Sequence, residues 1–291
     1  QSFGYQFEHR FNDVFTARQN FRYLDSQVTN DQVYAYGWTT PTSNELNRYY
    51  SGGDEKLHAF IIDNMLQAEF FTGAIKQTVL MGADYQRRKT VVDWTSGSLQ
   101  PINAFNPVYG NSAISYYSPT SYLRRLEQTG VYLQEQMKWD KWVLLLGGRY
   151  DWASTDSTTK TLRTGAKSQS SLDSKAFTGR IGLVYLFDNG LAPYASYAES
   201  FNPQSGTGYG GSVFKPTEGK QYEIGIKYQP PGSNSFITAA IFDLRQSNVL
   251  TTDPDPTHLC GTGRCQSQDG EVQSRGFELE GKASLNDKLD I

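Results

Sequence analysis

The chain has 291 residues, a formal net charge of −3 and a mean hydropathy of −0.57, although 14% of its residues are aromatic. The slightly acidic charge argues against a nucleic-acid partner, because nucleic-acid-binding surfaces are usually strongly basic. The longest strongly apolar run, Trp142 to Leu146, is far shorter than the roughly 20 residues of a transmembrane helix, so no helical span is expected.

Apolar and polar side chains alternate from the start of the chain, where Phe3, Tyr5 and Phe7 stand between polar neighbours. A period of two is typical of a β-strand with two different faces. The same alternation recurs around residues 177–187 and 222–228. The sequence therefore predicts strands at residues 2–12, 14–25, 56–71, 76–93, 122–139, 141–154, 175–188, 191–200, 219–229, 235–248 and 271–285, with a twelfth beginning near residue 287.

The connections between these strands alternate between short and long. The short ones have turn composition, as in Asn12-Asp13, Asp188-Asn189-Gly190 and Asn286-Asp287. The long ones are rich in Ser, Thr, Gly, Pro and Asn and cover residues 26–55, 94–121, 155–174, 201–218 and 249–270. A soluble sandwich has no reason to lengthen every second loop, whereas an outer-membrane β-barrel has tight periplasmic turns and extended external loops.

Aromatic residues gather at the ends of the predicted strands, with Trp139, Trp142 and Trp152 as examples. These positions suit the aromatic belts of a membrane barrel, and a soluble aromatic core is the alternative. Longer strands, such as the one at residues 122–139, should project above the membrane. We expect an all-β fold of about 12 antiparallel strands that forms part of a larger barrel, because spanning strands must close into a sheet without edges.

Both ends of the sequence also favour a fragment. The first residues lack the features of a signal peptide and have the pattern of mid-strand residues, and the last ones form a strand that has barely begun. We therefore expect that both ends were cut from a longer protein.

Residues with catalytic or metal-binding chemistry are scarce. There are 3 His residues, and no P-loop, nucleophile elbow or metalloprotease pair is present, so neither an enzyme nor a cofactor nor a resident metal is expected. The glycine-rich run at residues 206–211 opens no predicted helix and is interpreted as an outer loop. Asp253 and Asp255 fit a solvated turn better than a calcium site.

The two cysteines, Cys260 and Cys265, lie close together in a glycine-rich segment. This spacing favours a local disulfide in an oxidising compartment. A free pair and a metal site are the alternatives, although a metal site needs about four ligands.

Short segments across nearly the whole chain carry a family resemblance: residues 7–20, 54–57, 128–132, 146–152, 185–190, 197–201, 219–225 and 275–280. In this order they resemble the ferric hydroxamate siderophore receptors, the ferrichrome-type TonB-dependent transporters. The resemblance implies that residues 1–291 form roughly half of a 22-stranded barrel wall, with the plug domain, the TonB-interacting segment and the C-terminal strands outside this sequence.

The resemblance also implies a function. The expected protein is a monomeric receptor in the bacterial outer membrane that captures a ferric siderophore and imports it with energy from the TonB complex. A passive porin-type channel is the alternative, because it shares the wall pattern without needing a capture site or a plug. Iron would arrive already coordinated by the siderophore.

Within this resemblance, the segment at residues 33–37 is similar to a paired-tyrosine motif of the external siderophore cavity, which implies a binding role for Tyr34 and Tyr36. Trp94 resembles a second aromatic contributor. Phenol and indole groups suit a ligand with an apolar skeleton and polar oxygens, although ordinary loop or belt aromatics are the alternative. The best-known ferrichrome receptors have a cysteine pair in the loop after these tyrosines, which this chain lacks, so ferrioxamine-type and other hydroxamates fit as well as ferrichrome.

Overall fold

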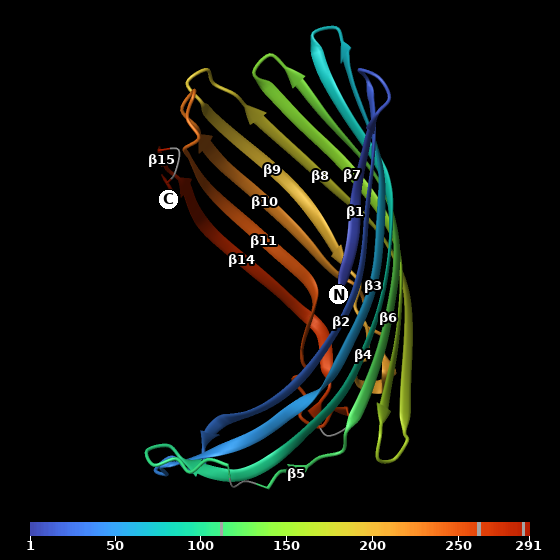
Figure 1. Cartoon of the computed structure of the whole chain (residues 1–291), viewed down its shortest axis with the longest axis vertical. Helices are drawn as coiled ribbons and strands as arrows, with labels where there is room; N and C mark the ends of the chain where they lie inside the picture. The colour runs from blue at the N-terminus through green and yellow to red at the C-terminus, as the bar shows by residue number, and fades with distance from the viewer. Residues whose placement is uncertain (111–112, 261–262, 287–288) are drawn as a thin grey trace.

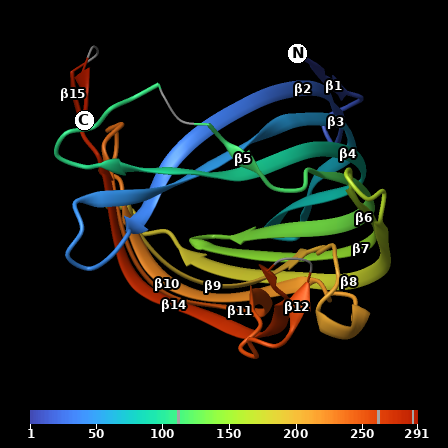
Figure 2. The same cartoon turned by 90° about the horizontal axis from the view of Figure 1, so that it is seen from below.

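The computed structural model describes residues 1–110, 113–260, 263–286 and 289–291. A 12-stranded sheet dominates these residues, and its wall strands follow one another in chain order. Figure 1 shows that the sheet curves around an open concave side, and Figure 2 shows the same wall from below. Among the described residues, no helix is long and apolar enough to cross a membrane.

The wall is an up-and-down series of antiparallel strands: β1 (Ser2–Arg10), β2 (Phe15–Trp38), β3 (Glu45–Thr72), β4 (Ile75–Asn103), β6 (Thr120–Trp139), β7 (Trp142–Thr161), β8 (Lys167–Tyr185), β9 (Leu191–Asn202), β10 (Thr217–Tyr228), β11 (Phe236–Thr252) and β14 (Gln266–Lys282). Smaller elements sit at the ends of the wall: β5 (Ser115–Tyr116), which pairs with β4, the 3-10 turn η1 (Tyr209–Gly211), the pair β12 (Leu259–Cys260) and β13 (Gly263–Arg264), and the pair β15 (Ser284–Asn286) and β16 (Leu289–Asp290). The predicted antiparallel all-β fold is confirmed. The predicted turn at Asn286-Asp287 and the start of the twelfth strand fall partly outside the described residues.

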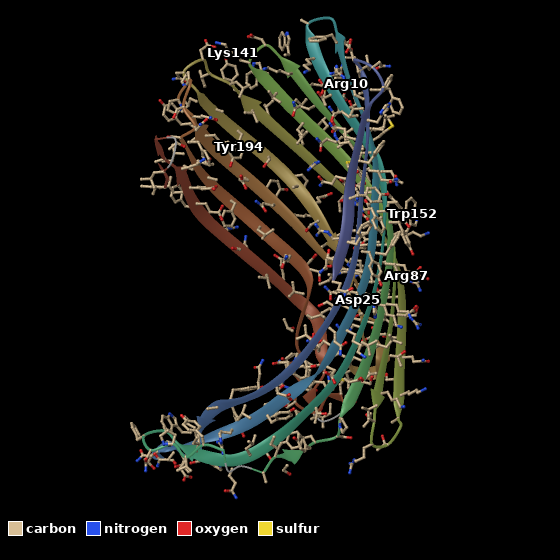
Figure 3. All side chains as sticks on the ribbon, viewed as in Figure 1. Arg10, Asp25, Arg87, Lys141, Trp152 and Tyr194 are labelled. Carbon is tan, nitrogen blue, oxygen red and sulfur yellow. A yellow bond between two sulfur atoms is a disulfide. The ribbon has the colours of Figure 1, made fainter. Side chains whose placement is uncertain are left out.

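The two faces of the wall have opposite chemistry, because directly paired residues share a face. Ile181 of β8 pairs with Leu146 on β7 and with Tyr197 on β9, and these side chains belong to the convex face. Trp152 points away from the concave side in Figure 3. Large apolar side chains on this face remain exposed, including Ile224 at 61% and Phe277 at 66%. An apolar surface of this extent suits lipid contact rather than water.

Aromatic side chains border this apolar band at both ends. On β7, Trp142 lies near the short turns and Trp152 lies ten residues further on. Ten residues at about 3.4 Å per residue span about 34 Å along the strand, or about 24 Å along the membrane normal at a tilt of about 45°. This matches the apolar band of roughly 25 Å in outer-membrane barrels.

The external ends of the strands differ from the prediction. The segments at residues 26–55 and 155–174 were predicted to be long loops, but β2 extends to Trp38, β3 begins at Glu45, and β7 and β8 continue to Thr161 and from Lys167. Parts of the predicted loops 94–121 and 249–270 are also strand. Above the membrane both faces of a strand meet water, so the apolar alternation is lost while the backbone hydrogen bonds continue. The long strand at residues 122–139 is confirmed to extend well beyond the apolar band.

Candidate functional site: the external tyrosine cluster

The external ends of β2, β3 and β4 bend toward the concave side of the wall (Figure 1). On this bent portion the Tyr34 ring lies 5.4 Å from that of Tyr49, its direct partner on β3. The rings of Tyr36 and Tyr117 each lie 6.4 Å from the Tyr49 ring. We call these four residues the tyrosine cluster. The structure thus brings both sequence-predicted tyrosines together around a third one.

A β-bulge positions the end of β2. Ala35 pairs with Arg48 and Gly37 pairs with Asn47, which leaves Tyr36 without a directly opposed residue. Such a bulge bends the strand and redirects side chains. Gly37 has a φ of 146°, a conformation that residues with a side chain rarely adopt. The Tyr36 ring stands at 87° to the Tyr49 ring.

The tyrosine cluster is open to a ligand. Tyr34 is 44% exposed and Tyr36 is 64% exposed. Among the described residues, neither phenol has a hydrogen-bond partner. Each therefore offers a ring face together with a free hydroxyl, which suits a ligand with apolar and oxygen-rich parts.

Trp94 lies on the same face but not in the cluster. It pairs with Gly53 on β3 and with Thr120 on β6. Ser98, the β4 partner of Tyr49, is four residues further from the membrane. In the described part of the chain no ring contact joins Trp94 to the cluster, so it stands below the tyrosines on the concave wall.

Tyr50, the neighbour of Tyr49, faces the other way. Its hydroxyl donates a 2.5 Å hydrogen bond to Asp31, and its ring lies 5.4 Å from that of Tyr116. The hydrogen bond to the Asp31 carboxylate raises the pKa of Tyr50 to about 12. Adjacent tyrosines on β3 thus have different roles: Tyr50 is held by its own chain, whereas the hydroxyl of Tyr49 is free within the described residues.

A hollow of about 570 Å³ borders Tyr34 at this end of the wall. It is lined mainly by apolar side chains, with Val33, Arg48 and Leu99 among its residues. The register places these three residues on the face opposite to the Tyr34 ring. Tyr34 also belongs to the lining, so the hollow adjoins the tyrosine cluster from the other side of the wall.

A polar network lines the concave wall closer to the membrane. The Arg149 guanidinium forms an ion pair with Asp84 and a 2.7 Å ion pair with Asp151. Gln128 donates a 2.7 Å hydrogen bond to Asp151, which is only 2% exposed. These residues come from β4, β6 and β7, so the network fastens three strands across the concave face.

Two strand glycines make room for the large side chains of this face. A Cβ on Gly130 would collide with the Arg149 guanidinium, and one on Gly82 would collide with the Tyr132 ring. The Tyr132 hydroxyl can then reach Asp63 on β3 at 2.7 Å. Glycine in a strand interior therefore marks a close approach here, as it often does in sheets.

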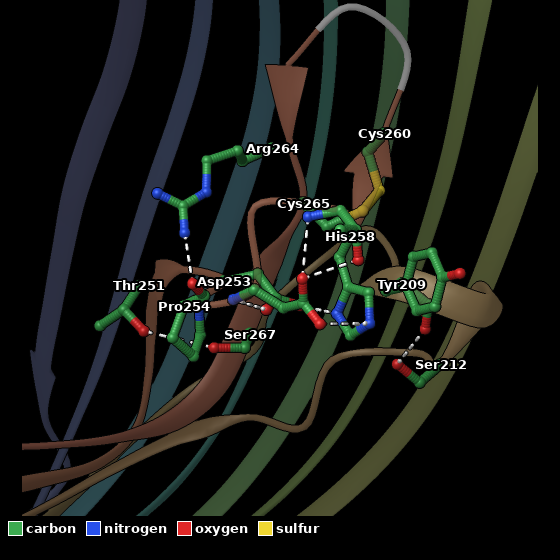
Figure 4. Close-up of polar contacts among 12 residues, drawn as sticks. Tyr209, Ser212, Thr251, Asp253, Pro254, His258, Cys260, Arg264, Cys265 and Ser267 are labelled. Carbon is green, nitrogen blue, oxygen red and sulfur yellow. Dashed lines mark hydrogen bonds and ion pairs between the residues drawn. A yellow bond between two sulfur atoms is a disulfide. The ribbon is translucent and has the colours of Figure 1, made fainter.

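Two external loops meet near the disulfide (Figure 4). Cys260 and Cys265 are joined by an S–S bond of 2.07 Å. The His258 ring stacks on that of Tyr209 at 3.8 Å, and its Nδ1 lies 2.9 Å from the Asp253 carboxylate. The loop at residues 203–216 is thereby attached to the segment at residues 253–260. We call this contact the loop junction.

The acidic residues of the loop junction have internal partners. Asp253 accepts a 2.9 Å hydrogen bond from the backbone N–H of Asp255, and Asp255 accepts one of 2.8 Å from that of Thr257. The hydrogen bond from the Asp255 N–H and the one with His258 lower the pKa of Asp253. These bonds agree with a turn, and the described residues contain no group of three or more side chains placed to hold a metal ion.

Sequence reasoning missed Tyr49 and Tyr117. Both lie in segments that were predicted to be loops, where no alternation indicated a face. Had β3 been predicted to begin at Glu45, the adjacent Tyr49 and Tyr50 would have been expected on opposite faces of the strand, and Tyr49 could have been placed beside Tyr34.

Comparisons with known proteins agree with this architecture. Residues 1–290 match the family model described as "TonB dependent receptor-like, beta-barrel". The chain is 43% identical over 290 residues to the ferrioxamine B receptor of Salmonella typhimurium strain SL1344, covering 99% of this chain and 39% of that protein. It is 38% identical over 312 residues to the ferrichrome outer membrane transporter/phage receptor of Escherichia coli strain K12, covering 99% of this chain and 40% of that protein.

Solved structures show the same fold. The siderophore receptor PiuA from Acinetobacter baumannii superposes with a TM-score of 0.77 at 20% identity, covering 97% of this chain and 44% of that one. The chain thus spans about two fifths of the length of the curated relatives named above. Its antiparallel wall, its apolar convex face and its match along almost every residue place it in the TonB-dependent receptor family of outer-membrane β-barrels.

Proposed function

We propose that the full-length protein containing this chain is an outer-membrane receptor that captures a ferric hydroxamate siderophore and imports it with TonB-coupled energy. Residues 1–291 would supply one continuous stretch of its barrel wall. The plug, the TonB-interacting segment and the remaining strands would come from the rest of a monomeric protein.

The tyrosine cluster is the observation that carries this proposal. Its rings lie on the concave side of the wall at the external end, where an incoming ligand first meets the barrel. Exposed rings with free hydroxyls can contact the apolar chain of a siderophore and donate hydrogen bonds to its iron-bound oxygens. The protein needs no iron ligand of its own for this, because the siderophore carries the iron.

The relatives support the choice of ligand class. Proteins at 43% and 38% identity are named as receptors for ferrioxamine B and for ferrichrome, both of which are hydroxamates. We place ferrioxamine-type ligands first, since the identity to that receptor is the higher of the two. A passive porin is disfavoured, because the whole chain matches a receptor family.

The direct test is ligand binding to the full-length receptor in detergent, measured by quenching of its intrinsic fluorescence. Ferrioxamine B and ferrichrome should each be tested beside their iron-free forms. We expect at least one ferric complex to bind, and Tyr34→Ala and Tyr36→Ala each to weaken it by about five- to tenfold, since a well-placed aromatic contact contributes about 1–1.5 kcal/mol. Binding that is unchanged in both variants would contradict the site. Equal flux of unrelated small solutes, with no saturable ferric ligand, would favour the porin.

A further inference from the structure

A second, smaller hollow lies on the concave wall between the external ends of β6, β7 and β8 and the loop at residues 203–216. Its volume is about 200 Å³. The loop lies beside these strand ends in Figure 2 and contributes Ser205, Thr207 and the buried Phe214. Gln266, at the start of β14, also lines the hollow. Segments that are far apart in the sequence therefore converge on it.

Its lining is hydroxyl-rich and contains no carboxylate. The hydroxyl groups come from Tyr122, Ser157, Thr158, Thr159, Ser168, Ser170, Ser205 and Thr207, and Arg124 is the only charged side chain among the lining residues that the structure describes. Sites for drug-sized ligands occupy about 300–1,000 Å³, so a hollow of this size suits a much smaller occupant.

Two of these polar groups lack partners. The Ser157 hydroxyl is buried without a hydrogen bond in the described structure. A buried polar group of this kind is uncommon in native proteins, because leaving it unpaired costs free energy. Among the described residues, the Arg124 guanidinium has neither an ion pair nor a hydrogen bond. The register pairs Arg124 directly with Ser157, so the free cation and the unpaired hydroxyl are neighbours on adjacent strands.

The charged residues around Arg124 also favour an anion in this hollow. Arg124 pairs directly with Thr90 on the neighbouring strand β4. Arg88 lies two residues before Thr90 on the same face, so it is a diagonal neighbour of Arg124. It also lacks an ion pair within the described residues. Along the wall strands, the nearest carboxylate on this face by register is Glu55, two strands away on β3. On the loop side, Asp253 lies opposite Cys265 and is paired with His258. Two uncompensated guanidinium groups beside a row of hydroxyls create a local preference for an anion.

We propose that this hollow is a binding site for a small oxyanion, such as phosphate, held by Arg124 and by the hydroxyl of Ser157 with its neighbours. The site is distinct from the tyrosine cluster and does not depend on the siderophore proposal. Arginine is suited to the task, because its planar fork of N–H donors matches the oxygens of phosphate and carboxylate groups. Binding an anion there would give both unpaired groups a partner. It would also connect the loop at residues 203–216 to the wall.

The test is titration of the full-length receptor with inorganic phosphate at constant ionic strength, followed by ³¹P line broadening and by calorimetry. The key pair of variants is Arg124→Gln and Arg125→Gln, because these adjacent arginines of β6 face opposite sides of the wall. We expect saturable binding, weakened at least about tenfold by Arg124→Gln and left unchanged by Arg125→Gln. Ser157→Ala should weaken it severalfold, and Arg124→Lys should restore part of it.

Two more ligands define the chemistry that the hollow selects. Glucose tests whether the hydroxyl lining binds a neutral polyol, and sulfate tests whether any tetrahedral oxyanion is accepted. Saturation by glucose but not by phosphate would overturn the proposal. So would equal losses in both arginine variants, or no saturation at about 20 mM phosphate, a concentration far above that of a specific site. Far-UV circular dichroism of each variant shows that the barrel is intact.

Discussion

The membrane band of the wall and its external ends are built from the same strands but follow different rules. In the band, one face meets lipid and the other meets the polar interior, so apolar and polar residues alternate, as around Ile181 and Arg180. At the external ends both faces are wet, and β7 continues through Ser154, Thr155 and Asp156 without alternation. In the band, contact with lipid on one face and water on the other determines the pattern of side chains. At the external ends, backbone pairing and a few specific side chains determine the structure. The proposed recognition chemistry lies at the external ends.

The largest expected effect comes from placing a charge in the centre of the band. Ile181 on the convex face lies four residues from Tyr185 and four from Phe177, which border the band. Ile181→Arg should lower the free energy of unfolding by about 2–4 kcal/mol, as for a cation at the bilayer midplane. The measurement is urea unfolding of the full-length barrel in lipid vesicles.

The same substitution at an external position provides the control. Ser171 is on the same strand and the same face as Ile181, but it is exposed beyond the band. Ser171→Arg should change the free energy of unfolding by less than about 0.5 kcal/mol. Similar losses at both positions would mean that the band has been placed wrongly.

A substitution on the polar, concave side of the band should lower the free energy of unfolding nearly as much. Arg149→Ala leaves Asp151, which is 2% exposed, without its cation. Removing one partner of a buried ion pair costs about 3–5 kcal/mol, but the Arg149 side chain is 31% exposed, so we expect about 2–3 kcal/mol. Vesicle unfolding again measures it. Adding Asp151→Asn to Arg149→Ala should recover part of the loss, and no recovery would mean that the charge left unpaired is not its cause.

The membrane band could be predicted from the sequence, whereas much of the external ends could not. The alternation identified the strands of the band, their antiparallel order and the aromatic borders at Trp142 and Trp152. It failed at the external ends of β2, β3, β7 and β8, because a strand in water on both sides has no periodic signature. Tyr34 and Tyr36 were found through a resemblance, whereas Tyr49 was missed because its contacts depend on a register and a bulge that local sequence does not specify.

The smallest expected effect concerns the loop junction at the external end. The pKa of Asp253 and that of Asp255 are lowered in the folded protein by their hydrogen bonds and by His258. Carboxylates with depressed pKa values stabilise the fold above their unfolded pKa of about 3.9, and this contribution is lost as the pH falls through the folded value. The junction should therefore persist from pH 7 to about pH 5 and open only below about pH 4.

Hydrogen exchange of residues 253–258, corrected for the intrinsic effect of pH, measures this opening. The membrane band should stay protected at the same pH. Asp253→Asn should reduce the acid sensitivity of the junction. A junction that already opens near pH 6 would contradict the assignment to these two carboxylates.

The proposed capture site depends most on which face of the external wall meets the ligand, and two adjacent residues of β3 test it. Tyr49 and Tyr50 have the same side chain and point to opposite faces. The measurement is the Kd of ferrioxamine B for the full-length receptor and for its Tyr49→Ala and Tyr50→Ala variants. We predict that Tyr49→Ala weakens binding by about tenfold or more while Tyr50→Ala leaves it within about twofold. The reverse pattern, or equal losses, would contradict the proposed site.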